Sequence, residues 1–355
     1  KECDWSSDVC SSDLVGFSCI NASRPKLRGV SIDATNGILA CNSWDSATFR
    51  DIHIYPYATT LMRNHSPPEL DRRDGTGFRL CGQQDDTHVD DVFSGAHTTN
   101  FLFSGGPNPW PPNASSTSIG AIMIGKIWSD GISRNDPARP TRGVVFGRSG
   151  NKISFDQIYS YGASAPVLFD HAPRLPNAET IWRSSGYAIF GNHLYINGSP
   201  ESAALDSDTC LHARSGSLFI KSIHIRACKT NGILVSSTVD HLDVGGGRIE
   251  VIGPNPPAAT TGGRAVFVEP GLTAEKIRIG AIVTDQAAGQ PLISGALGMP
   301  NLRIAGNALQ LPSGDDFVVS GGSSLARIDG GWAGRKITLQ FSQPIDRKST
   351  RLNSS

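Results

Sequence analysis

Acidic residues recur beside aromatic residues in the first half of this chain. Asp130 lies two positions after Trp128, and Asp156 lies three positions before Tyr159. Two carboxylates that flank a glycosidic bond supply the acid and the base of its hydrolysis, and a carboxylate with a Lys, Arg or Tyr base serves an elimination. This pattern predicts acid–base chemistry on a polysaccharide. The candidate catalytic residues are Asp130, Asp156, Asp86 and Asp85, the last two from the run GQQDDTHVDD.

These carboxylates also have structural interpretations. Asp85 and Asp86 are typical of a solvated loop, because Asp favours turns by bonding to nearby backbone. Asp51 and Asp91 occupy a repeated position at which Asp bonds to the backbone of a turn, so we expect capping there.

Aromatic residues recur at one outward-facing position of a repeat that runs along the chain. Neighbouring repeats would place their rings in a strip, which suits sugars whose apolar faces stack and whose hydroxyls need polar partners. Alternatively, long loops or another subunit cover the strip, since contiguous exposed apolar surface often marks an interface. The candidate substrate-binding residues are Trp128, Tyr159, Tyr195, Phe93, His224, Arg226 and Asp243.

A charged cluster follows the aromatic residues toward the C-terminus. It suits an acidic sugar, or a lyase that needs a base and a cation to stabilise developing negative charge. The alternative is a ladder of surface ion pairs between neighbouring strands. The cluster consists of Lys221, His224, Arg226, His241, Asp243, Lys276 and Arg278.

A seven-position pattern of apolar, any, polar or small, apolar, any, apolar or small, any must position these residues. A second short apolar segment alternates with it, as in GILA at Gly37 and YAIF at Tyr187. One such pair per coil is what stacked parallel strands require, and insertions leave as loops. The pattern predicts an all-β parallel solenoid of about ten to eleven rungs. The instances begin at Leu27, Phe49, Val89, Ile124, Phe155, Gly191, Ile220, Val239, Ala274 and Met299.

The recurring F-x-D-I-x-I type of strand, at Phe49–Ile54 and in shortened form at Phe155–Ile158, resembles a known family. It is similar to the single-stranded right-handed parallel β-helices of pectate lyases, polygalacturonases and phage tailspike depolymerases. The resemblance covers nearly the whole body of the chain. It implies a right-handed helix, a polysaccharide substrate cleaved by a glycosidase or a lyase and, as in tailspikes, a homotrimer. A pattern of this kind specifies the fold far better than the chemistry.

One motif of the polygalacturonases is partly matched. A paired Asp followed by a Gly-His element supplies their acid and base, and Asp85, Asp86 and the later His97 in SGAH are similar in order. The chain departs from the family because Ala96 interrupts the Gly-His step. No Asn-x-Asp precedes the paired Asp, and no Arg-x-Lys follows it.

Composition excludes several classes of protein. The chain has 32 Lys and Arg against 32 Asp and Glu, with no basic run, so we expect no nucleic-acid partner. No apolar stretch approaches the length of a membrane span. The five cysteines between residues 15 and 345 lack metal-ligand spacing, so we expect buried hydrophobic cysteines, no metal and no cofactor.

The two ends of the chain have an unusual relationship. A DNA that encodes Asp4–Leu14 has a reverse complement that encodes Asp346–Ser355, and this DNA resembles a sequencing adapter. We therefore expect residues 1–14 and 346–355 to be an adapter artefact. The natural part, 15–345, would be one parallel β-helix domain from a metagenomic fragment, open at both ends.

Two functions remain open at this stage. The first is a polysaccharide-binding and polysaccharide-degrading β-helix, such as the shaft of a phage tailspike. The second is a non-catalytic structural β-helix, such as a tail fibre or an adhesin. Either function implies an extracellular or virion-associated protein.

Overall fold

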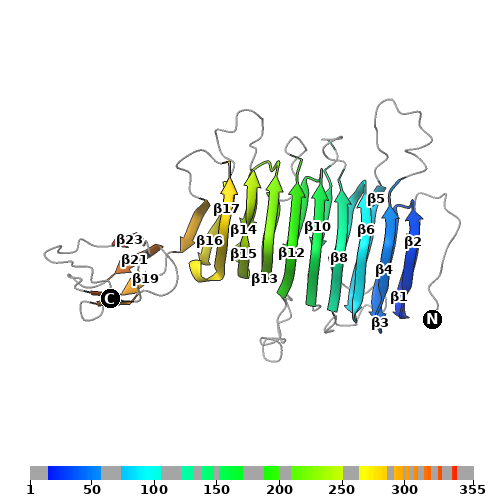
Figure 1. The fold of residues 1–355 in the computed structure, drawn as a ribbon, viewed down its shortest axis with the longest axis horizontal. Helices are drawn as coiled ribbons and strands as arrows, with labels where there is room; N and C mark the ends of the chain where they lie inside the picture. The colour runs from blue at the N-terminus through cyan, green and yellow to red at the C-terminus, as the bar shows by residue number, and fades with distance from the viewer. Residues whose placement is uncertain are drawn as a thin grey trace.

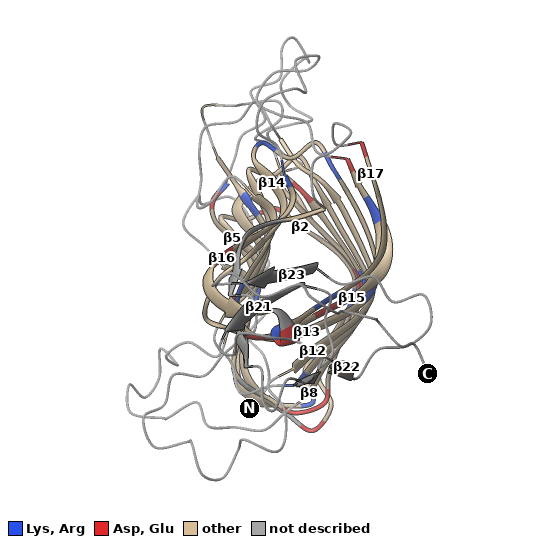
Figure 2. Cartoon of the chain, turned by 90° about the vertical axis from the view of Figure 1, so that its left-hand side faces the viewer, with Lys and Arg blue, Asp and Glu red and all other residues tan. Residues whose placement is uncertain are grey.

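The computed structural model forms a solenoid of parallel strands (Figure 1). It describes residues 15–56, 73–104, 121–131, 138, 140–147, 152–170, 188–199, 209–250, 264–285 and 292–298, and five short strands between residues 301 and 341. Each coil contributes one strand to sheet A and one to sheet B, and all their pairings are parallel. The two sheets face each other around the interior when the solenoid is viewed along its axis (Figure 2).

Sheet A contains β1 (Val15–Ser23), β3 (Asn36–Trp44), β5 (Arg73–Gln84), β7 (His97–Ser104), β9 (Arg142–Phe146), β11 (Ala165–Asp170), the first part of β13 (Thr209–Arg226), β14 (Asn231–Val235), β16 (Arg264–Thr273) and β18 (Ile293–Gly298). Sheet B contains β2 (Lys26–Ile32), β4 (Thr48–Ile54), β6 (Thr87–Gly95), β8 (Ala121–Asp130), β10 (Lys152–Tyr161), β12 (Ala188–Asn197), the second part of β13, β15 (Val239–Glu250) and β17 (Ile277–Thr284). The predicted all-β parallel solenoid is confirmed. The one helical element among the described residues is the 3-10 turn η1 (Ala274–Lys276).

The core is built by alternation, since every second residue of most strands points between the sheets. Phe103, Phe146 and Phe169 come from successive sheet A strands, and their rings stack with centroids 5.1 and 4.8 Å apart. All three are buried. Burying one such side chain contributes about 1.5–3 kcal/mol, so the stack helps to fix the rungs in register.

The repeat predicts the alignment of sheet B correctly up to β13 and incorrectly beyond it. Ile220 lies beside Val244, and Val244 lies beside Ile279. The true repeats therefore begin five residues after the predicted Val239 and Ala274. The sequence hides this because Gly247 fills an inward apolar position, opposite Ile223. A Cβ at Gly247 would lie 1.9 Å from the Ile223 carbonyl oxygen, so a larger residue does not fit there.

Two further parts of the repeat differ from the prediction. The segment YAIF at Tyr187 is not a separate strand of sheet A, because its last three residues begin β12 in sheet B. The tenth predicted instance, at Met299, contains β19 (Asn301–Arg303). This strand pairs with neither sheet A nor sheet B, which together comprise β1 to β18. It pairs in parallel with β21 (Asp316–Ser320), which pairs with β23 (Thr338–Phe341), while β20 (Ala308–Gln310) pairs with β22 (Arg327–Asp329).

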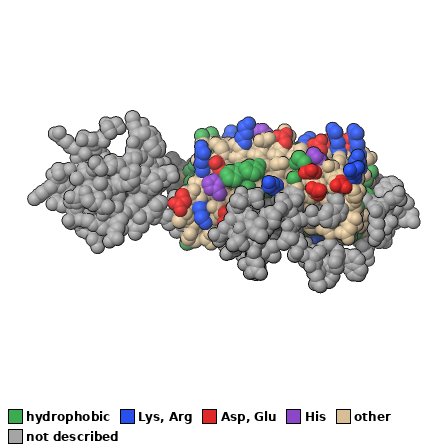
Figure 3. Space-filling model, turned by 90° about the horizontal axis from the view of Figure 1, so that it is seen from below, with side chains coloured by type: hydrophobic (Ala, Val, Ile, Leu, Met, Phe, Trp, Pro, Cys, Tyr) green, Lys and Arg blue, Asp and Glu red, His purple; other side chains and the backbone are tan. Residues whose placement is uncertain are grey.

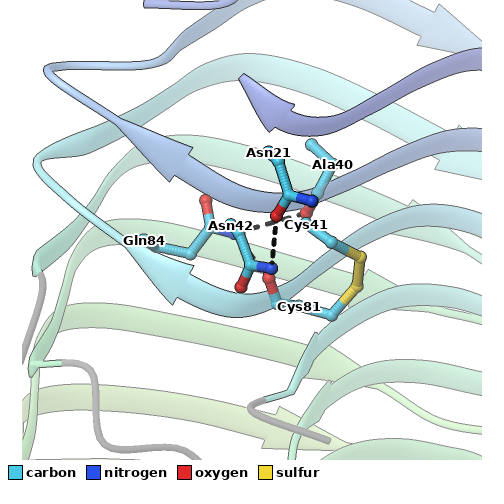
Figure 4. Close-up of a disulfide and its surroundings, with 6 residues drawn as sticks. All are labelled: Asn21, Ala40, Cys41, Asn42, Cys81 and Gln84. Atoms are coloured by element: carbon cyan, nitrogen blue, oxygen red, sulfur yellow. Dashed lines mark hydrogen bonds between the residues drawn. A yellow bond between two sulfur atoms is a disulfide. The ribbon is translucent and has the colours of Figure 1, made fainter. Parts of the chain in front are cut away.

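The cysteines form disulfides, which corrects the expectation of free buried thiols. Cys41 on β3 bonds to Cys81 on β5, and the Gln84 amide donates to the carbonyl oxygens of Ala40 and Cys81 beside this bridge (Figure 4). Cys210 bonds to Cys228, 18 residues later, and so ties the two ends of one coil. Disulfides persist in oxidising compartments.

Candidate functional site

The predicted aromatic strip exists on the outer face of sheet B. Phe93, Trp128, Tyr159, Tyr195 and His224 are register partners along five successive rungs. The side chain of Trp128 is 44% exposed, while the other four are partly buried. The strip is therefore most accessible at Trp128.

The rings of the strip contact each other through their faces. The Trp128 and Tyr159 rings stack with centroids 5.1 Å apart and an interplanar angle of 20°. Tyr195 lies 5.8 Å from Tyr159 at 40°. Stacking of this kind contributes about 0.5–1.5 kcal/mol per pair, so part of the strip's role is to hold neighbouring rungs together.

The strip is interrupted between Phe93 and Trp128. These two residues are register partners, yet the Phe93 ring stacks on His53 at 5.1 Å and leans toward Tyr55 instead. Trp128 thus ends a continuous stack of rings. Its indole also lies near a cation, with Lys126 Nζ 5.8 Å from the ring centroid. Trp128 is therefore the ring of the strip with the most exposed surface.

His224 and Arg226 are occupied by contacts within the protein. The His224 ring meets Tyr195 edge-on at 5.0 Å, and its Nε2 atom is buried without a hydrogen-bond partner. Arg226 forms an ion pair with Glu250 at 3.8 Å. Glu250 also pairs with Arg248 at 2.5 Å. Arg226 is therefore held in a cross-strand ion pair, as in the ladder of surface pairs that was the alternative interpretation of this cluster.

Asp243 does not lie beneath His224, because of the register correction in β15. Arg248 takes that place, and Asp243 lies beside Phe219 instead. Its carboxylate pairs with Arg278 at 3.7 Å. Asp243 is thus near the beginning of the sheet B strands, away from the strip with which it was predicted to act.

Asp130 lies beside the strip, at the end of β8. Its neighbours in register are Gly95 and Tyr161, and Trp128 is on the same side of its own strand. None of the hydrogen bonds or ion pairs between described residues involves its carboxylate. Burial raises the pKa of the Asp130 carboxyl from 3.8 to about 6. A carboxyl group of this kind carries a proton to a higher pH and suits a general acid.

A polar corner fixes the backbone of Asp130. The Ala96 N–H donates to the Asp130 carbonyl oxygen at 3.0 Å, and Asn100 donates to Ser129 Oγ at 2.8 Å. The His97 ring is buried within hydrogen-bond distance of the Gly95 and Ala34 carbonyl oxygens. Desolvation lowers the pKa of His97, so the neutral ring is favoured.

The other candidate carboxylates are far from Asp130. Asp156 precedes Tyr161, the neighbour of Asp130, by five residues, which is roughly 16 Å along a strand. Its carboxylate accepts a hydrogen bond from Asn192 at 3.0 Å. Asp85 and Asp86 form the corner before β6, and the Asp85 N–H donates to the Ser43 carbonyl oxygen.

The Asp85–Asp86 corner and His97 lie at opposite ends of β6. The polygalacturonase-like arrangement of these three residues is therefore not formed. The two catalytic carboxylates of glycosidases are about 5–9.5 Å apart. None of the other predicted acidic residues lies that close to Asp130.

A second feature of the same face was missed by the sequence interpretation. A shallow hollow of about 400 Å³ lies over β10, β12, β13 and β15, with Phe190, Phe219, Asn192 and Lys221 in its lining. Phe190 is 54% exposed. The sequence pattern placed Phe190 in the second set of short apolar segments, whereas it belongs to β12 of sheet B, where the register places it on the outer face. The sequence did contain one indication of this orientation. Gly191 aligns with the inward-facing Phe155, so its neighbour Phe190 must face outward.

The chain matches no protein-family model, and comparisons with curated proteins and with solved structures give no significant match. The fold and the outer face of sheet B therefore define its class, a parallel β-solenoid with an aromatic and charged face. Within the described residues, no group of His, Cys, Asp and Glu side chains has the arrangement of a metal site. The part of the chain that the structure describes also has no helix long and apolar enough to span a bilayer.

Proposed function

We propose that this protein binds a polysaccharide on the outer face of sheet B and cleaves it, with Asp130 as the general acid. The observation that carries the proposal is the pairing of an exposed Trp128 with a half-buried carboxyl two residues away. The indole offers a face for a sugar ring, and Asp130 offers a proton to the glycosidic oxygen beside it. The pKa of about 6 keeps that proton available in mildly acidic solution.

The chemistry at Asp130 proceeds in one of two ways. In hydrolysis, Asp130 protonates the leaving oxygen as its bond to the anomeric carbon breaks and water adds to that carbon, and the proton released by this water passes to solvent, from which Asp130 is reprotonated. In elimination, a base removes the proton next to a sugar carboxylate, and the leaving oxygen takes its proton from Asp130. Tyr161, the register neighbour of Asp130, is the residue we propose as that base.

The test is to incubate the protein with a panel of bacterial capsular and plant acidic polysaccharides. Reducing ends and the ultraviolet absorbance of unsaturated products are followed together. Reducing ends alone indicate a hydrolase, and both signals indicate a lyase. The Asp130→Asn variant should give neither signal. If the folded wild-type protein also gives neither, the catalytic part of the proposal is wrong.

A structural role is the second candidate, because Trp128 and Tyr159 use their ring faces on each other. In that case the protein is a non-catalytic fibre or adhesin and the strip reinforces the solenoid. For either function we propose an extracellular or virion-associated protein, which the Cys41–Cys81 and Cys210–Cys228 disulfides support. We also propose a homotrimer of the tailspike type, and light scattering in solution would test it.

A further inference from the structure

The hollow over β10, β12, β13 and β15 combines an aromatic surface with polar groups. Phe190 and Phe219 stack with centroids 5.1 Å apart and planes inclined by 11°, and Phe219 is 5.1 Å from the His241 ring. More than half of the Phe190 side chain is exposed. Figure 3 views the solenoid perpendicular to its long axis, from the side on which the sheet B strands begin. Hydrophobic side chains gather on this side beside basic, acidic and His side chains.

The charges around the hollow leave one cation available. The Asp243 carboxylate is paired with Arg278 at 3.7 Å, and the Asp156 carboxylate accepts a hydrogen bond from Asn192 at 3.0 Å. Lys221 is exposed, and none of the ion pairs between described residues involves it. An apolar ring surface beside an available ammonium group complements a ligand with one apolar face and a negative charge.

The size and shape of the hollow further limit the kind of ligand that fits it. Its volume of about 400 Å³ lies in the lower range of small-ligand sites. Gly245 contributes bare backbone to the lining, because a Cβ there would lie 2.6 Å from the Lys221 carbonyl oxygen. The Asn192 side chain also lines the hollow, and beyond the N–H that it donates to Asp156 it has a second N–H and a carbonyl oxygen for hydroxyl groups. A sugar ring that carries a carboxylate meets each of these features.

We propose that this hollow is a second binding site, which anchors an acidic sugar of the polysaccharide at a distance from Asp130. Phe190 lies seven residues before Asn197, the register partner of Tyr161, so roughly 23 Å of strand separates the hollow from Asp130. Only a chain of several sugars spans both sites. The inference rests on the proposed function in that both sites serve one polysaccharide.

Two-site binding has a consequence that depends on the length of the ligand. A long chain that occupies both sites gains affinity, because its second contact is intramolecular. A short oligosaccharide at Asp130 gains nothing from the hollow. Changes in the hollow should therefore weaken the binding of polymers and leave the cleavage of short oligosaccharides unchanged.

The experiment uses affinity electrophoresis with polygalacturonate, hyaluronate and polysialic acid in the gel and dextran as the neutral reference. The Asp130→Asn change prevents cleavage during the run. Phe190→Ser and Lys221→Met are added separately, and Val283→Ser, which removes another exposed hydrophobic side chain, is the matched control. We expect each hollow variant to weaken binding of an acidic polymer about tenfold and the control to leave it unchanged.

The outcomes separate this inference from the proposed function. If an acidic polymer retards the protein and neither hollow variant alters its mobility, the anchoring site is wrong while polysaccharide binding stands. If no acidic polymer retards the folded protein more than dextran does, the anchoring site is also wrong. Cleavage by the enzyme that retains Asp130, measured on short oligosaccharides, reports on the proposed function alone.

Discussion

Asn100 donates a 2.8 Å hydrogen bond to Ser129 Oγ, directly before Asp130 in the chain. The same Asn100 side chain accepts a hydrogen bond from the His97 N–H at 3.1 Å. All three of Asn100, Ser129 and His97 are buried. A polar amide inside the solenoid thus links sheet A to the strand end that carries the candidate acid.

Replacement of Asn100 by Ala should destabilise the fold. The change leaves the buried Ser129 hydroxyl and the His97 N–H without these partners, at a cost of about 1–3 kcal/mol for each unsatisfied group. Urea unfolding followed by circular dichroism measures the loss. Asn192→Ala is the control, because its hydrogen bond to Asp156 is exposed and its loss should cost little. Equal stabilities of the two variants would contradict the prediction.

Replacement of Trp128 by Ala separates the two candidate functions. If the indole packs against sugar, polysaccharide affinity falls, and stability falls by the area that the indole buries plus about 0.5–1.5 kcal/mol for the stacked pair with Tyr159. Calorimetric titration and thermal unfolding measure the two effects. Unchanged affinity with lowered stability would instead favour the structural role. Val283→Ala, on the exposed surface of β17, is the control.

The fold could be predicted from the sequence because inward residues recur at the first, fourth and sixth positions of the seven-position pattern, as at Phe49, Ile52 and Ile54. The seven-position pattern located the sheet B strands as far as Ile220 correctly. It failed where Gly247 occupies an inward place, since a position defined by close backbone packing carries no apolar signal. Because the predicted register was wrong at this glycine, Asp243 was placed beside His224, whereas it lies beside Phe219.

The site was less predictable for a different reason. Trp128 and Asp130 were named correctly as neighbours on one face, because alternation alone places them there. Whether a carboxylate has an ion-pair partner depends on contacts between neighbouring rungs. The Arg226–Glu250 pair could not be predicted, because the predicted register of β15 was wrong. Disulfide pairing of Cys210 with Cys228 likewise depends on how one coil closes, which spacing does not specify.

Loss of the Cys210–Cys228 disulfide should lower the stability of the solenoid. The bridge closes a loop of 18 residues, and the entropy removed from the unfolded chain corresponds to about 3 kcal/mol. The paired change Cys210→Ala with Cys228→Ala should therefore lower the unfolding midpoint in urea. Reduced wild-type protein is the comparison. A variant as stable as the oxidised wild type would show that this bridge contributes nothing to folding.

The half-buried carboxyl of Asp130 should make stability depend on pH. Burial raises its folded pKa from 3.8 to about 6, so the folded state binds this proton more tightly than the unfolded chain. The stabilising effect of the proton is present below about pH 4 and is lost as pH rises through about 6. Asp130→Asn removes the charge and should be more stable than the wild type at pH 8, by up to about 2 kcal/mol after solvent screening.

Urea midpoints of the wild type and of Asp130→Asn at pH 4 and pH 8 measure this difference. The midpoints should be close at pH 4 and should separate at pH 8. Asp156→Asn, which changes an exposed carboxylate on the same face, is the control. If Asp130 is the general acid, cleavage by the wild type should also decline as pH rises above about 6, because the protonated fraction falls. Parallel pH profiles of stability for the two proteins would rule out a raised pKa at Asp130 and remove the main support for its role as the acid.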